Sequence, residues 1–140
     1  MTPRDWLEQL RQAQGDGAVQ WAQRLAATGD PDVIAAVLDA VERPENRDVQ
    51  GPLLQALMAL DCGAHLVRLA ALMGGEGYEV KFMTVNVMES IAAPVAADQQ
   101  RQAAEMLHRL REDGGALPQE EWNMIDYALQ LVERLPVRGT

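Results

Sequence analysis

The chain has 140 residues with a formal net charge of −9, and 48% of its residues are apolar although only 4% are aromatic. This length predicts one domain with a sizeable core, and so acidic a chain repels nucleic-acid phosphates and anionic membranes. The apolar residues are mostly Ala, Leu, Val and Met, so the composition predicts an all-α protein.

Residues 1–29 predict a pair of helices. The first helix starts at Pro3, and two glycines around position 16 separate it from a second helix that ends near Gly29. Trp6 and Trp21 are candidates for partner contacts. Both fall on an apolar stripe, however, so we expect them to pack against the core.

Residues 30–61 predict a second pair. Asp30 and Pro31 have the residue types of an N-cap and a first helical position, and residues 43–46 form a turn before a helix that starts near Asp48. The predicted buried stripes contain Val33, Ile34, Val37, Leu38 and Val41 in the first helix and Leu53, Leu54, Leu57, Met58 and Leu60 in the second.

Residues 62–92 predict a third pair around a glycine turn. The turn contains Gly74, Gly75 and Gly77, and it is so short that the two helices must be antiparallel. The predicted apolar stripes contain Leu66, Leu69, Ala70 and Met73 in the first helix and Val80, Met83, Val87 and Ile91 in the second.

Residues 96–135 predict the last pair. Its first helix starts at Ala97 and closes at Gly114, its second helix starts at Pro118, and we expect the tail over residues 136–140 to fray.

The helix pairs predict a repeat architecture. Pairs begin near residues 30, 63 and 96, about 33 residues apart, and residues 1–29 have the character of a capping pair. One amphipathic pair cannot bury its apolar face alone, so neighbouring pairs must stack. We therefore expect one domain over residues 1–140, an all-α fold of about eight helices stacked as a short HEAT-like solenoid.

Little in the sequence predicts catalysis. Cys62 lies near a predicted helix start and His65 follows one turn later, but a lone cysteine is more often a small buried residue than a nucleophile. Two histidines and one cysteine do not supply a metal site, and the glycines at 74–77 lack the lysine of a phosphate-binding loop. We expect no enzyme, no cofactor and no metal.

The polar surface is the remaining candidate. In stacked helix pairs the second helices often line a face that binds a partner, although a plain solvated helix face is the simpler interpretation. As a group these polar residues predict an acidic groove for a basic protein. The candidate partner-binding residues are Asp61, Tyr78, Glu79, Asn86, Glu89, Glu120, Glu121, Asn123, Asp126 and Tyr127.

Two segments carry a resemblance to a known family. Residues 78–88, YEVKFMTVNVM, resemble the second helix of HEAT-like repeats, with an acid, a valine and a basic residue at its start. Together with residues 60–69, LDCGAHLVRL, this block resembles a bacterial immunity-protein family of polymorphic toxin systems, the Imm30 type. The resemblance extends over roughly residues 30–92.

The resemblance implies a protein that binds and neutralises a cognate toxin domain in the cytoplasm and has no catalysis of its own. Such toxins are often nucleases with basic surfaces, which an acidic inhibitor would complement. The alternative is a HEAT-like adaptor or scaffold for another cytoplasmic protein. The N-terminus resembles no signal peptide and no apolar run is long enough to span a bilayer, while dimerisation stays open.

Overall fold

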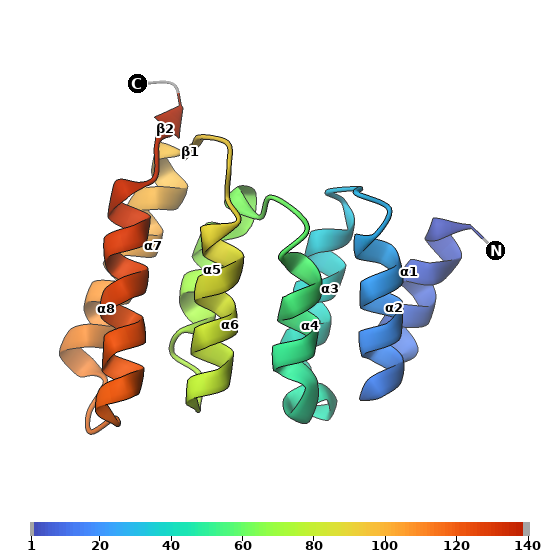
Figure 1. The fold of residues 1–140 in the computed structure, drawn as a ribbon, viewed down its shortest axis with the longest axis horizontal. Helices are drawn as coiled ribbons and strands as arrows, with labels where there is room; N and C mark the ends of the chain where they lie inside the picture. Colours follow the sequence, from blue (N-terminus) through green and yellow to red (C-terminus); the bar gives the residue numbers. More distant parts are fainter. Residues whose placement is uncertain (1, 139–140) are drawn as a thin grey trace. The chain divides into compact units, whose positions relative to one another are not determined.

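Helix hairpins are the building blocks of the structure (Figure 1). The computed structural model describes residues 2–138, and the chain divides into two units, Met1–Asp61 and Cys62–Thr140. The elements of the first unit are α1 (Pro3–Gln12), α2 (Asp16–Ala26), α3 (Val33–Glu42), the 3-10 helix η1 (Pro44–Val49) and α4 (Gln50–Leu57). Those of the second are the 3-10 helix η2 (Gly63–His65), α5 (Leu66–Leu72), α6 (Tyr78–Glu89), β1 (Val95–Ala96), α7 (Ala97–Asp113), α8 (Gln119–Arg134) and β2 (Val137–Arg138).

The first unit consists of two stacked hairpins. The α1–α2 hairpin packs on the α3–α4 hairpin, with α1 against α3 and α2 against α4. Thr2 caps α1, because the Asp5 amide donates to Thr2 Oγ1 at 3.4 Å and the Thr2 amide donates to Asp5 Oδ2 at 2.8 Å. The core between these helices contains Leu10, Ala18, Ala22, Leu25, Ile34, Val37, Leu38, Val41, Leu53, Leu54 and Leu57.

Helix boundaries in this unit differ from the sequence prediction. Asp30 does not cap α3 directly: its Oδ1 accepts the Asp32 amide at 2.9 Å, which makes a local turn, and the helix begins at Val33. Residues 44–46 of the predicted turn belong to η1, so α4 begins at Gln50 rather than near residue 48. Met58 follows the end of α4 and is 39% exposed, although the apolar pattern predicts it in the core.

The second unit repeats this arrangement. The α5–α6 hairpin packs on the α7–α8 hairpin, with α5 against α7 and α6 against α8 (Figure 1). Helices α6 and α8 run in the same direction, because each is the second helix of its hairpin. The apolar core contains Leu66, Leu69, Ala70, Met73, Val85, Val87, Met88, Ala103, Leu107, Ile125, Ala128 and Val132.

Helix α6 buries a different side from the one predicted. Val87 is buried as expected, but Val80, Met83 and Ile91 are only half-buried. The buried side instead includes Lys81 and Thr84, together with Val85 and Met88. Two polar residues, Lys81 and Thr84, therefore occupy core positions, although the apolar pattern assigns both of them to the surface.

A short strand pair closes the α7–α8 hairpin. Strands β1 and β2 are parallel, with Val95 opposite Val137 and Ala96 opposite Arg138. Gln100 Nε2 also donates to the carbonyls of Val132 and Leu135, each at 3.0 Å. The prediction of a frayed tail is therefore wrong for residues 137–138, and residues 139–140 lie outside the described part.

The fold class is the predicted one, an all-α protein, and within each unit hairpins stack as the repeat pattern requires. A solenoid running through all the pairs, within one domain, stays a prediction. Between residues 2 and 138 no helix combines the length and the apolar character needed to cross a membrane.

Tryptophans lie beneath arginines in both units. In the first unit, the Arg24 guanidinium lies 5.8 Å from the ring centroid of Trp6 and 4.9 Å from that of Trp21. In the second, the Arg111 guanidinium lies 5.0 Å from the Trp122 ring. All three indoles are half-buried, so they seal the edges of the cores rather than filling the centres.

Candidate functional site

The single phenylalanine and both tyrosines of the chain are exposed. Tyr78 and Phe82 are each 43% exposed, and Tyr127 is 45% exposed. Aromatic side chains usually contribute to the core of a small domain, where they bury a large apolar area. Here all three lie on α6 and α8, two helices of the second unit that pack against each other.

The outer side of α6 begins with an aromatic pair. The Tyr78 and Phe82 rings stack with centroids 5.8 Å apart and an interplanar angle of 24°. They are one helical turn apart, so they cover the same stretch of helix surface. Asn86, half-buried, and Glu89, exposed, continue this stripe at the spacing of successive turns.

The outer side of α8 carries a second stripe. Asn123, Tyr127, Gln130 and Arg134 follow each other at intervals of three or four residues, and all are exposed. We call the two stripes together the α6–α8 face. It consists of Tyr78, Phe82, Asn86, Glu89, Asn123, Tyr127, Gln130 and Arg134.

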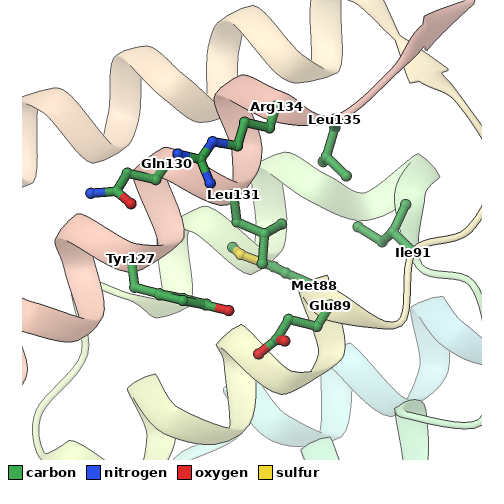
Figure 2. Close-up of a pocket in the computed structure, with 8 residues that line it drawn as sticks. All are labelled: Met88, Glu89, Ile91, Tyr127, Gln130, Leu131, Arg134 and Leu135. Carbon is green, nitrogen blue, oxygen red and sulfur yellow. The ribbon is translucent and has the colours of Figure 1, made fainter.

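A pocket of about 330 Å³ lies where the C-terminal halves of α6 and α8 meet. Figure 2 shows Met88 and Leu131 in its middle, with the Glu89 carboxylate and the Tyr127 ring approaching each other from the two helices. Arg134 extends along α8 toward Gln130 (Figure 2). The residues that line the pocket are Met88, Glu89, Ile91, Tyr127, Gln130, Leu131, Arg134 and Leu135.

Most of the predicted partner-binding residues of this unit have accessible side chains. Tyr78, Asn86, Glu89, Asn123 and Tyr127 belong to the α6–α8 face. Glu79 and Glu120 are exposed near the starts of the same two helices. Asp61 is also exposed, but it belongs to the first unit and is not part of this face.

Two predicted acids are engaged inside the unit. Glu121 is only 8% exposed, and its Oε1 accepts from the ammonium of the buried Lys81 at 2.9 Å, so its assignment to an exposed acidic surface is wrong. Asp126 is half-buried and pairs with Arg111 across α7 and α8 at 2.8 Å. The α6–α8 face is therefore aromatic and of mixed charge rather than a continuous acidic groove.

Three residues of the face escape the sequence prediction: Phe82, Gln130 and Arg134. Phe82 has the residue type of a core position, and only its place one turn after Tyr78 signals a shared stripe. Gln130 and Arg134 follow Tyr127 at helical spacing, which is the signal that would identify them.

The Cys62 and His65 pair offers little for catalysis. Cys62 is fully buried, which does not suit a nucleophile that must reach a substrate. Burial, and next the charge of Arg68, lower the pKa of His65 below its ordinary value of 6.5. Among the residues that the structure describes, no three His, Cys, Asp or Glu side chains gather as metal ligands would.

Comparisons with known proteins supply no further identification. No protein-family model, no curated protein and no solved structure matches the chain.

Proposed function

We propose that this chain is a binding protein that captures another protein through the α6–α8 face. One observation carries the proposal: Tyr78, Phe82 and Tyr127 are all exposed on neighbouring helices. Exposed aromatic side chains leave apolar area in water, and tyrosine is enriched among the residues that dominate binding energy at interfaces. Polar side chains around the three rings supply the rim that such an interface needs.

The partner that suits this surface best is a cognate toxin domain, which the chain would neutralise as an immunity protein. The resemblance of residues 60–69 and 78–88 to the immunity-protein family supports this function. The net charge of −9 supports a basic partner, such as a nuclease toxin. Inhibition then requires tight binding alone, with no chemistry in the chain itself.

A HEAT-like adaptor in the cytoplasm is the second candidate. The stacking of hairpins within each unit favours it, because adaptors of that class use the same repeat arrangement to present a binding surface. An immunity protein should restore growth to cells that express the toxin encoded beside it. An adaptor should leave growth under toxin expression unchanged.

The test begins with the partner and then probes the face. The tagged chain is recovered from its native cells, the bound protein is identified by mass spectrometry, and that protein is purified for calorimetry. We expect the double substitution Phe82→Ala and Tyr127→Ala to weaken binding by about 30-fold or more, the loss typical of two aromatic anchors.

Gln102→Ala is the control, since Gln102 is exposed on α7, a helix of the same unit whose residues are not part of the α6–α8 face. It should bind within about twofold of wild type, as a surface substitution away from an interface does. Circular dichroism should stay unchanged in every variant, because the replaced side chains lie outside the core. Full-strength binding by the double variant would place the interface elsewhere.

A further inference from the structure

We infer that the pocket between α6 and α8 receives an arginine side chain of the partner protein. The inference rests on the proposed function, because it names the group that the α6–α8 face recognises. The inference is based on three features of the pocket: an apolar floor, the Glu89 carboxylate, which has no partner among the described residues, and the Tyr127 ring beside that carboxylate.

The pocket floor suits a long aliphatic stem. Met88, Ile91 and Leu131 contribute methyl and methylene groups to the lining, and the volume of about 330 Å³ exceeds that of one long side chain. Arginine and lysine both bury three or four methylenes along apolar surface while the charged end stays near water. A pocket with this floor and a charged mouth therefore favours a basic side chain over a purely apolar one.

The polar groups at the mouth select the guanidinium. Glu89 lies on α6 opposite the Tyr127 ring of α8 (Figure 2), and among the described residues its carboxylate has no hydrogen-bond or ion-pair partner. A planar guanidinium can lie on an aromatic face and donate two hydrogen bonds to one carboxylate. An ammonium group lacks this paired geometry, so arginine should bind better than lysine.

Arg134 determines which end of the pocket the incoming guanidinium occupies. It lies on the α8 edge beside Gln130 (Figure 2), and its charge opposes a second cation there. The incoming guanidinium is therefore directed to the end that carries Glu89 and Tyr127. Removing the charge of Glu89 should therefore weaken the binding of an arginine side chain, and removing the charge of Arg134 should strengthen it.

The experiment uses the full chain and a defined probe. The peptide acetyl-Ala-Ala-Arg-Ala-Ala-amide is titrated into methyl-labelled protein, and NMR follows the methyl groups of Met88, Ile91 and Leu131. We expect saturable shifts with a dissociation constant in the millimolar range, as befits one side chain. The peptide with citrulline in place of arginine has nearly the same shape without charge, and it should bind roughly fivefold more weakly.

Three variants complete the design. Glu89→Gln should weaken the arginine peptide by roughly fivefold, whereas Arg134→Gln should strengthen it by about twofold. Glu79→Gln removes the same charge from an exposed position of α6 outside the pocket, so it should leave the affinity within about 1.5-fold of wild type.

Absence of saturable shifts, equal binding of the citrulline peptide, or an affinity unchanged by Glu89→Gln would each overturn the inference. The two proposals fail separately. If the arginine peptide does not bind while Phe82→Ala with Tyr127→Ala still weakens the purified partner, the pocket inference falls and the binding face stands. If no substitution on the α6–α8 face changes the affinity for the purified partner, the proposed function falls.

Discussion

The buried ammonium of Lys81 is the most demanding single group in the second unit. It is 1% exposed, it donates to Glu121 Oε1 at 2.9 Å, and it donates as well to the carbonyl of Gly75. A buried charge is tolerated only when close partners replace its lost hydration. The pair therefore joins the glycine turn before α6 to the first turn of α8.

Substituting one partner of this ion pair should be costly. Glu121→Leu leaves the Lys81 charge buried without its counterion, and we expect the free energy of unfolding to fall by about 3 kcal/mol. Urea denaturation measures the loss. The double variant with Lys81→Met should recover most of it, because no unpaired charge remains.

Glu120→Leu is the control for this experiment, since Glu120 is exposed beside Glu121 on the same helix. Its effect should stay within about 0.5 kcal/mol. Equal stability of Glu121→Leu and wild type would mean that the Lys81 charge finds other partners.

At the scale of elements, η1 and Arg43, the residue that precedes it, close the first unit through their side chains. Arg43 donates to the carbonyls of Leu10 and Arg11 near the end of α1, the first of these at 2.8 Å. The fully buried Asn46 accepts the Gly15 amide at 2.9 Å and donates to the Ala40 carbonyl at 3.0 Å. Backbone groups at the end of α1 and the start of α2 are thus satisfied from a segment about 30 residues away.

Removing the Asn46 amide should loosen the turn between α1 and α2. Asn46→Ala leaves the half-buried Gly15 N–H without its acceptor and removes one of two donors to the Ala40 carbonyl, which still accepts from the Arg43 amide at 3.3 Å. We expect a loss of about 1–2 kcal/mol in the free energy of unfolding. Amide hydrogen exchange gives the local reading: the Gly15 amide should exchange faster, whereas amides of α7 should change only with global stability. The exposed neighbour Glu45 is the control, and Glu45→Ala should leave the exchange of Gly15 unaltered.

The helices whose ends are marked by glycine or proline were the predictable part of the fold. Glycine and proline positions mark the four hairpins, and α7 begins at Ala97 as the pattern indicates. The buried side of α6 was not predictable, because Lys81 reads as a surface residue until its partner, 40 residues away, is known. The same limit applies to η1 and the residue before it, because Asn46 and Arg43 hydrogen-bond to residues of the preceding hairpin.

The candidate site divides in a similar way. Polar residues and tyrosines on the second helices were identifiable from helical spacing, as Tyr78, Glu89 and Tyr127 illustrate. Phe82 was not, because an apolar residue in an amphipathic helix is ordinarily assigned to the core. The pocket itself depends on which side chains of α6 and α8 meet, and this requires the packing of two distant segments.

At the scale of the whole molecule, net charge governs encounter with a partner. The chain has 21 acidic and 12 basic side chains, which gives the net charge of −9. If the partner is basic, long-range attraction accelerates association, and salt screens it over a distance of about 10 Å at 0.1 M. Dissociation depends on close contacts and is less sensitive to salt.

We therefore expect association with the purified partner to slow by about tenfold between roughly 50 mM and 500 mM NaCl, with a much smaller change in the dissociation rate. Surface plasmon resonance resolves the two rates. Potassium fluoride in place of NaCl should give the same dependence on ionic strength, because the effect is electrostatic screening. An association rate that stays constant across this range would mean that the partner carries no net positive charge.

The tryptophans beneath arginines have an optical consequence. Trp6 and Trp21 belong to the first unit and Trp122 to the second, so each unit carries its own natural fluorophores. Unfolding exposes a half-buried indole to water and shifts its emission to longer wavelength. The chain with Trp122→Phe then emits from the first unit alone, and a chain that retains only Trp122 emits from the second. The thermal unfolding of each unit can thus be followed by its own tryptophan fluorescence, without an attached dye.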